Sequence, residues 1–144
     1  MQAAVGCAQL KKFPSFVQRR RANFERLYKA LECVQDKLIL PTPAENANPS
    51  WFGFCITCRD GVNREKVVPY IESKGVQTRM LFAGNLVKHP CFDQMREAKE
   101  GYRVVGDLAN TDKIMNSTFW VGVYPGMTDE MIDYMAKTII EAVQ

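Results

Sequence analysis

Apolar residues recur at three- and four-residue steps along the first quarter of the chain. Between residues 15 and 36 they share one face of a helix: Phe16, Val17, Phe24, Leu27, Tyr28, Leu31 and Val34. Residues 3–10 are also helix formers, and no Ser, Thr, Asp or Asn stands ahead of them as a cap. The pattern predicts a helix over 15–36, with Pro14 at its first turn or at a kink in a longer helix. A chain that begins inside a helix is expected to be a fragment.

Alternation with a period of two follows a loop rich in proline and asparagine at 38–50. Residues 51–58 place apolar side chains at every second position: Phe52, Phe54, Ile56 and Cys58. Residues 76–82 and 118–124 are similarly short and apolar. We expect these three segments to be strands.

Capping residues delimit the helices between these strands. Asn63 can cap a helix that runs to about Lys74, in which Pro69 predicts a kink or a later start. Asn110 or Thr111 can cap a shorter helix further along the chain.

The last helix has the clearest pattern. Thr128 can cap it, and Asp129 and Glu130 complement the helix dipole in its first turn. One apolar stripe then runs along it: Met131, Ile132, Met135, Ala136, Ile139, Ile140 and Val143.

The order of elements is helix, strand, helix, strand, irregular region, strand, helix. Three amphipathic helices can cover one face of a small sheet, so the predicted class is a two-layer α/β sandwich. The strand–helix–strand unit at 51–82 predicts a right-handed crossover, which leaves room for the third strand between or beside the first two. The irregular region at 83–108 is expected to hold one helical turn near 92–97.

Composition excludes several classes of protein. With 47% hydrophobic and 24% charged residues, the chain is neither disordered, collagen-like nor a coiled coil. Its apolar runs are too short to span a membrane, and a net charge of +3 does not argue for nucleic-acid binding. The start lacks the basic leader of a secretory signal, and five irregularly spaced cysteines indicate free thiols. We therefore expect a cytoplasmic protein without membrane or nucleic-acid partners.

Isolated motifs supply no complete active site. The pair Cys55 and Cys58 has Cys-x-x-Cys spacing, but a strand sends the two thiols to opposite faces, so we interpret them as structural. The run 19–21 together with Arg26 could bind phosphate, or it could be a solvated face balanced by glutamates. His89, the only histidine, lacks triad partners, and there is no glycine-rich phosphate loop. We predict no catalytic, cofactor-binding or metal-binding residue.

An ordered set of segments is more specific than any single motif. It comprises residues 1–10, 19–23, 50–54, 75–79, 82–86, 89–90, 106–112 and 119–126, among them Ser50-Trp51-Phe52-Gly53-Phe54 and Phe82-Ala83-Gly84-Asn85-Leu86. In this combination the chain resembles, over essentially its whole length, the C-terminal domain of the DegT-type sugar aminotransferases. The resemblance is greatest to the CDP-4-keto-6-deoxyglucose 3-dehydratases of lipopolysaccharide biosynthesis. One departure is Lys88-His89-Pro90, where that branch has Arg-Gln-Pro, a change that bears on substrate specificity.

The resemblance implies the small C-terminal domain of a fold type I enzyme that uses pyridoxal phosphate or pyridoxamine phosphate. Its expected fold is a three- to four-stranded, mainly antiparallel sheet covered by helices. Residues 1–36 would link it to a large domain upstream of Met1, and residues 37–144 would form the small domain. The large domain would hold most cofactor contacts and the iron–sulfur cysteines. It would also hold the position occupied by a Schiff-base lysine in aminotransferases and a histidine in dehydratases.

By the same resemblance, the chain is expected to belong to a homodimeric nucleotide-sugar 3-dehydratase that acts on a 4-keto-6-deoxyhexose. The isolated chain should bind no cofactor and catalyse nothing. One alternative is a nucleotide-sugar aminotransferase of the same fold. Another is a non-catalytic ligand-binding or interaction module.

Three residues are predicted to bind the nucleotide-sugar. Arg79 lies at the end of the second strand, and Asn85 and His89 lie in the loop after it. The structural alternatives are an interdomain salt bridge for Arg79 and a turn for Asn85. As ligand-binding groups, Arg79 and Asn85 should reach one open surface, with Arg79 outside the core. Residues 1–13 should expose apolar side chains that face the large domain.

Overall fold

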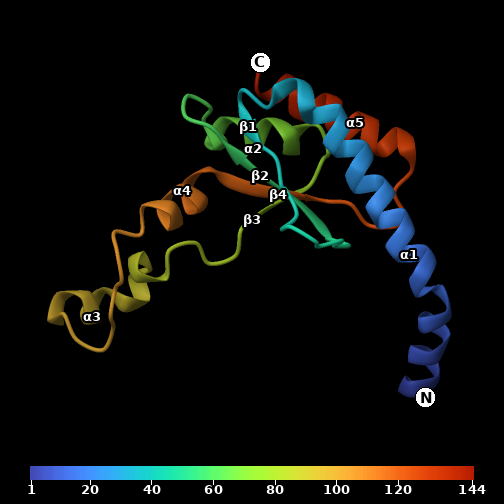
Figure 1. The fold of residues 1–144 in the computed structure, drawn as a ribbon. Coiled ribbons are helices and arrows are strands. Elements are labelled where there is room, and N and C mark those ends of the chain that lie inside the picture. Colours follow the sequence, from blue (N-terminus) through green and yellow to red (C-terminus); the bar gives the residue numbers. More distant parts are fainter.

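A four-stranded antiparallel sheet with the strand order β1-β2-β4-β3 lies at the centre of the computed structural model, which describes residues 1–144 (Figure 1). The strands are β1 (Leu38–Ile39), β2 (Gly53–Cys58), β3 (Thr78–Met80) and β4 (Thr118–Gly122). Strand β4 lies between β2 and β3, in the space that the crossover was expected to leave. Strand β1, which the sequence pattern did not identify, adds the fourth strand.

Side-chain alternation gives the sheet one buried and one open face. Phe54, Ile56 and Cys58 of β2 are buried, and the residues between them are half-buried. Phe119 and Val121 of β4 extend the buried face. Three helices supply the opposing core residues: Leu27 and Leu31 from α1, Val67, Val68 and Ile71 from α2, and Ile132, Met135 and Ile139 from α5. This confirms the predicted two-layer class.

Helix α1 (Gln2–Leu31) is longer than the predicted 15–36 at its start and shorter at its end, where the chain tightens into a 3-10 turn, η1 (Glu32–Val34). Pro14 lies inside the helix and not at its first turn. Met1 provides no side-chain cap, as the sequence indicated. Residues 1–16 are exposed, including Val5, Leu10 and Phe13, which confirms the apolar surface expected there.

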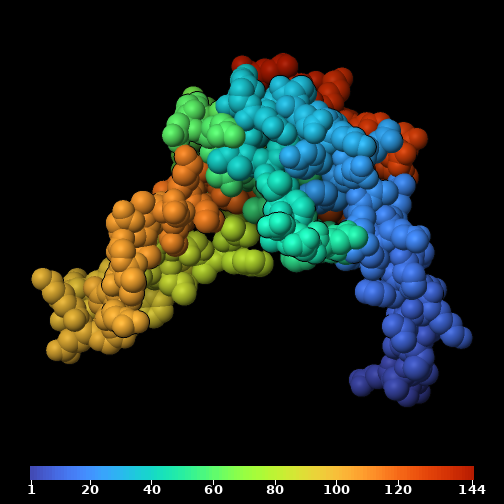
Figure 2. Space-filling view, in the orientation of Figure 1, coloured from blue at the N-terminus to red at the C-terminus, as the bar shows by residue number.

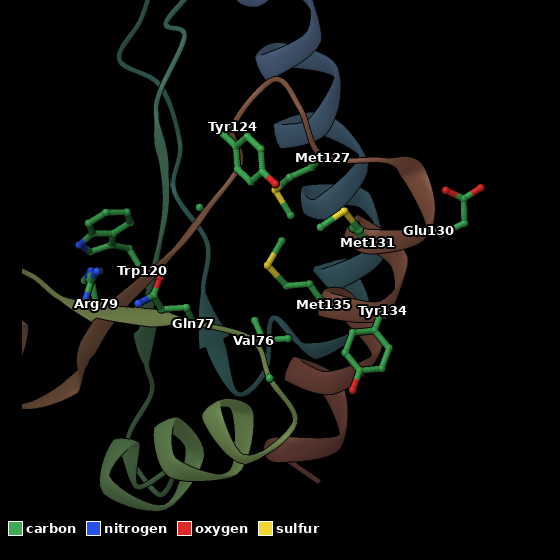
Figure 3. Close-up of a pocket in the computed structure, with 12 residues that line it drawn as sticks. Val76, Gln77, Arg79, Trp120, Tyr124, Met127, Glu130, Met131, Tyr134 and Met135 are labelled. Atoms are coloured by element: carbon green, nitrogen blue, oxygen red, sulfur yellow. The ribbon is translucent and has the colours of Figure 1, made fainter.

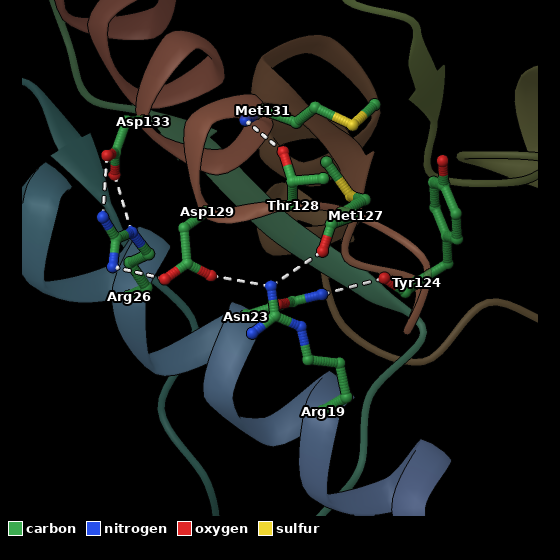
Figure 4. A network of polar contacts seen from close by, with 9 residues as sticks. All are labelled: Arg19, Asn23, Arg26, Tyr124, Met127, Thr128, Asp129, Met131 and Asp133. Atoms are coloured by element: carbon green, nitrogen blue, oxygen red, sulfur yellow. Dashed lines mark hydrogen bonds and ion pairs between the residues drawn. The ribbon is translucent and has the colours of Figure 1, made fainter.

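Polar contacts fix the second half of α1 on α5 (Asp129–Ala142) and on the turn before it (Figure 4). The Asn23 side chain is 1% exposed, and its Nδ2 donates to the Tyr124 carbonyl at 2.8 Å. Arg19 donates to the Met127 carbonyl at 2.8 Å and to Asp129 at 2.7 Å. Arg26 binds both Asp129 and Asp133.

The arginine cluster of α1 is therefore neither a phosphate-binding edge nor a face balanced by nearby glutamates. Arg19 and Arg26 pair with carboxylates of α5. Arg20 and Arg21 donate to backbone carbonyls of the loop at 48–50. Periodicity along α1 could not show this, because the partners on α5 lie about a hundred positions away in the chain.

Helix α2 (Arg64–Ser73) begins directly after Asn63, whose side chain accepts from the Glu65 amide at 2.8 Å. This confirms the predicted cap, but the later start expected from Pro69 is wrong. Pro69 lies inside the helix, near enough to its start that the missing N–H costs one early hydrogen bond. Gly75, with φ of +80°, ends the helix in the left-handed conformation.

Residues 83–108 project from the body as an irregular arm, which we define by that range (Figure 1). It contains the 3-10 turns η2 (Leu86–Lys88) and η3 (Pro90–Phe92) and one short helix, α3 (Asp93–Ala98). The predicted helical turn near 92–97 is confirmed by α3.

Helix α4 (Ala109–Ser117) follows the arm, but neither Asn110 nor Thr111 caps it. The chain enters through Leu108 in the left-handed conformation, and Asp107 accepts from the Ala109 amide at 3.0 Å. An aspartate outside the helix thus takes the capping role, which leaves the two expected caps inside the first turn. By contrast, Thr128 caps α5 as predicted, accepting from the Met131 amide at 3.3 Å.

Two projections leave a hollow on one side of the molecule. Figure 2 shows the first half of α1 and the arm extending to the same side of the body, with a concave surface between them. The apolar residues of α1 lie on one of these projections.

Replacement of Asn23 by alanine should lower the free energy of unfolding by about 1–2 kcal/mol, because it removes a buried donor from the Tyr124 carbonyl. The measurement is urea unfolding monitored by circular dichroism. Asn116→Ala, at an exposed position of α4, is the matched control and should change stability by less than about 0.5 kcal/mol. Equal losses in the two variants would contradict a special role for the buried amide.

Candidate functional site

Arg79 lies on the open face of the sheet, opposite Trp120 in the register of β3 and β4. Its side chain is exposed and lies outside the core, as predicted. No carboxylate of the chain forms an ion pair with it, so the guanidinium can bind an anion without breaking an internal contact. Its part in substrate binding stays a prediction.

Asn85 is placed differently from Arg79. Its side chain is 2% exposed, and its Nδ2 donates to Asp112 at 2.8 Å. Its Oδ1 accepts from the Val87 amide at 3.2 Å and so caps η2. The expectation that Arg79 and Asn85 reach one open surface is wrong, because both ends of the Asn85 amide are used to hold the loop.

The loop at 84–90, which carries Asn85 and His89, is held from both sides. On the α4 side, Asp112 accepts from Asn85 and from Lys88 Nζ, the latter at 2.7 Å. On the α3 side, Arg96 donates to the carbonyls of Val87 and His89.

His89 itself is partly exposed, and its Nε2 is hydrogen-bonded to the Ala83 carbonyl. Gly84 has φ of +64°, and a Cβ there would meet Met115 at 2.5 Å. The loop is therefore a fixed structure, whose substrate-binding role through His89 stays a prediction.

Charge keeps Asp112 ionised at the base of this loop. The hydrogen bonds from Lys88 and then from Asn85 lower the pKa of the Asp112 carboxyl below its usual range. The Asp112 carboxylate accepts from two side chains of the loop at 84–90 and so fixes that loop to α4 through charge-assisted hydrogen bonds.

A groove of about 600 Å³ lies between the ends of β3 and β4 and helix α5 (Figure 3). Arg79, Gln77 and Trp120 line its sheet side. Three methionines and a tyrosine line the opposite side: Tyr124, Met127, Met131 and Met135. Figure 3 shows the methionine side chains pointing into this space from α5 and the preceding turn.

Aromatic side chains cover another part of the open sheet face. Phe52 packs edge-on against Trp120, with ring centroids 5.2 Å apart. Gly53 allows this, because a Cβ at that position would lie 2.6 Å from the Trp120 ring. Phe82 is 80% exposed beside them. A large exposed aromatic patch of this kind is typical of a surface that contacts another part of a protein.

The two cysteines of the Cys-x-x-Cys pair lie on opposite faces of β2, as expected. Cys58 is buried and Cys55 is half-buried, and neither forms a disulfide. Burial raises the pKa of both thiols, so they stay protonated and unreactive near neutral pH.

The lining of the groove and of the aromatic patch was compared with the groups that hold a cofactor or a metal ion. No lysine that could form a Schiff base lines the groove or the aromatic patch. No group of three or more His, Cys, Asp or Glu side chains is placed to hold a metal ion.

No helix has the length and apolar character needed to cross a membrane.

Sequence reasoning missed the groove and the groups that hold the loop. Met127, Met131 and Met135 recur at intervals of four, but the periodicity indicated only that the last two belong to an apolar helical stripe. The signal that could have marked them is that methionine, and not leucine, occupies each position. No local pattern indicated Asp112 or Arg96, since their partners are set by the path of the arm.

Comparison with protein families gives one match over almost the whole chain. The DegT/DnrJ/EryC1/StrS aminotransferase family matches residues 1–140. The chain is 47% identical over 143 residues to the lipopolysaccharide biosynthesis protein RfbH of Salmonella typhimurium, covering 98% of this chain and 32% of that protein. It is 43% identical to dTDP-4-dehydro-2,6-dideoxy-D-glucose 3-dehydratase of Saccharopolyspora spinosa, covering 99% of this chain and 30% of the relative. The chain thus spans about a third of these relatives.

Solved structures show the same fold. Escherichia coli GDP-4-keto-6-deoxy-D-mannose-3-dehydratase with bound hydrated PLP is 27% identical, with a TM-score of 0.78 over 94% of this chain and 34% of that one. DesV of S. venezuelae, in complex with a ketimine intermediate, matches with a TM-score of 0.81 at 19% identity. It covers all of this chain and 36% of the DesV chain, and shows the fold alone.

Acidification should release the loop at 84–90 through Asp112. A carboxyl whose pKa is lowered in the folded state contributes stability above its ordinary pKa of about 4, and loses it as the pH falls through the lower, folded-state pKa. The side-chain amide signals of Asn85, followed by NMR from pH 7 downward, should lose their distinct shifts in that acidic range.

The matched variants separate this effect from general acid unfolding. Asp112→Asn should remove the transition and leave the Asn85 signals less dispersed at all pH values. Asp36→Asn, at an exposed position, should keep the wild-type profile. If the transition persisted in Asp112→Asn, it would have to arise from the titration of another group.

Proposed function

Because this chain belongs to the DegT/DnrJ/EryC1/StrS aminotransferase family, we propose that it is the C-terminal part of a nucleotide-sugar 3-dehydratase of lipopolysaccharide or deoxysugar biosynthesis. The observation that carries the proposal is its 47% and 43% identity, over nearly all its residues, to RfbH and to a dTDP-sugar 3-dehydratase. The solved structures named as aminotransferases share the fold at only 17–21% identity.

The whole enzyme would act with pyridoxal phosphate or pyridoxamine phosphate on a 4-keto-6-deoxyhexose attached to a nucleotide. A related structure contains hydrated PLP, and another contains GDP-perosamine. The cofactor supplies an electron sink. Most of its protein contacts and any iron–sulfur cluster would lie in the rest of the longer protein, which would form a homodimer. Residues 1–36 would lead from that part into the domain formed by 37–144.

The role proposed for this chain is to bind and enclose the substrate. Arg79 presents an unpaired guanidinium, which can donate charge-assisted hydrogen bonds to a phosphate. Asn85 acts indirectly, by holding with Asp112 the loop that presents His89. The hollow between α1 and the arm, with apolar side chains on both α1 and the open sheet face, fits contact with a large domain that excludes water from the site (Figure 2).

Two other functions remain distinct hypotheses. A nucleotide-sugar aminotransferase would have the same fold and differ at the Schiff-base position, which lies outside these residues. A non-catalytic module would bind a ligand without turnover. The 43% identity to a dTDP-sugar 3-dehydratase, together with the 47% identity to a lipopolysaccharide biosynthesis protein, favours the dehydratase.

The reaction type can be tested with the longer protein, supplied with pyridoxamine phosphate and a CDP-4-keto-6-deoxyhexose. Mass spectrometry should detect loss of one water from the sugar, with the 144-residue chain alone as an inactive control. Transfer of an amino group from glutamate to the sugar would establish the aminotransferase instead. Turnover by the 144-residue chain alone would contradict the proposal that catalysis requires the rest of the longer protein.

Substitution of Arg79 by alanine in the longer protein should weaken substrate handling by roughly 1.5–3 kcal/mol, or about 10- to 150-fold in kcat/KM, as expected for loss of a charge-assisted hydrogen bond. The melting temperature should stay nearly unchanged, because the side chain is exposed and unpaired. Arg103→Ala, at another exposed and unpaired position, is the control. A variant that unfolds yet keeps its activity per folded molecule would return Arg79 to a structural role.

A further inference from the structure

We propose that the groove between the β3–β4 edge and α5 binds the nucleoside diphosphate part of the substrate. The base would lie against the methionines and Tyr124, and the diphosphate would lie at Arg79 (Figure 3). This inference rests on the proposed function, because it identifies which part of a nucleotide-sugar the groove holds.

The methionine side of the groove is held in place by α1. Asn23 binds the Tyr124 carbonyl and Arg19 binds the Met127 carbonyl, so two points of the turn at 124–127 are fixed by side chains of another helix (Figure 4). Arg19 also binds Asp129 in the first turn of α5. A groove whose wall is fixed before binding costs little ordering entropy when a ligand enters.

The surface of this wall suits a flat, partly apolar group. Met127 and Met135 are buried at its base, whereas Met131 is 46% exposed and Tyr124 is 53% exposed. Thioether side chains are flexible and polarizable, and they pack well against aromatic rings. A nucleobase offers such a ring, and the volume of about 600 Å³ lies within the range of small-molecule sites.

The charge at the sheet side indicates an anion. The Arg79 guanidinium forms no ion pair, and the Gln77 amide lies beside it. Glu130 is the acidic residue of the lining, and Figure 3 shows its side chain directed away from the groove. Glu72, near Arg79, accepts a hydrogen bond from Thr78 Oγ1. An unpaired guanidinium beside an apolar wall matches a ligand with a phosphate at one end and a base at the other.

Gly122 provides the space between the two sides. It lines the groove, and a Cβ built on it would meet no heavy atom within 4 Å. Its backbone lies outside the positive φ range, so a side chain can be added there without strain. Valine at this strand position would fill the groove from its floor and leave the sheet intact.

The test uses the 144-residue chain with labelled methionine methyls and backbone amides, titrated with CDP and followed by NMR. The Met131 methyl, the Gly122 amide and the Trp120 indole should shift in a saturable manner. Cytidine should shift the methionine side with weaker affinity, and inorganic pyrophosphate should shift Arg79 with little effect on the methyls.

Three variants make the result specific. Gly122→Val should abolish the methyl shifts while keeping the spectrum of a folded protein. Arg79→Gln should raise the Kd for CDP by at least about tenfold, as expected when a charge-assisted contact to phosphate is lost. Arg103→Gln, exposed and outside the groove, should match the wild type.

Several outcomes would overturn the inference. CDP shifts confined to the loop at 84–90, shifts reproduced in full by pyrophosphate, or the absence of any saturable shift would each exclude a nucleoside diphosphate site in the groove. Dehydration of the sugar by the longer protein is measured separately. Activity there, together with an empty groove in the titration, would leave the proposed function standing and remove only this site.

Discussion

The seating of α1 on α5 is the contact on which the rest of the structure depends. Its centre is the Asn23 amide, buried between the helix and the Tyr124 carbonyl, with Arg19 and Arg26 bound to the acids of α5 on either side. The salt bridges are exposed and contribute little individually. The buried amide and the apolar residues Leu27 and Leu31 therefore set the position of α1. That position fixes the turn at 124–127 and, with it, one side of the groove.

The two candidate binding regions are built by different physical means. The groove is formed by packing, because methionines of α5 face the edge of the short strand β3. At the polar end of the groove, the Arg79 guanidinium forms no ion pair. The loop at 84–90 has no buried apolar anchor of its own and is held by side chains that bind its polar groups, chiefly Asp112 and Arg96. We therefore expect the shape of the groove to depend on the packing of the core, and the conformation of the loop to depend on charge and on pH.

Local chemistry in the sequence determined much of the fold. Alternation indicated β2, and a short apolar run indicated β4. Asn63 and Thr128 marked the starts of α2 and α5, and the uncapped start of α1 was visible in its first residues. These features succeed because each depends on residues a few positions apart. The cap of α4 and the later start of α2 were misjudged. At α4, Asp107 outside the helix binds the first amide in place of the expected caps, and at α2 the Asn63 cap sets the start although Pro69 follows it.

The sequence by itself determined the two-layer class, the family resemblance and the exposed position of Arg79, since these follow from periodicity, ordered motifs and the cost of burying a guanidinium. Only the tertiary structure decided that Asn85 is buried and that the α1 arginines bind α5 and the loop at 48–50. It also decided that three methionines face an unpaired arginine across a groove. The physical reason is distance along the chain. Asn23 and Tyr124 are 101 positions apart, and Asn85 and Asp112 are 27 apart, so their pairing exists only once the sheet has brought them together.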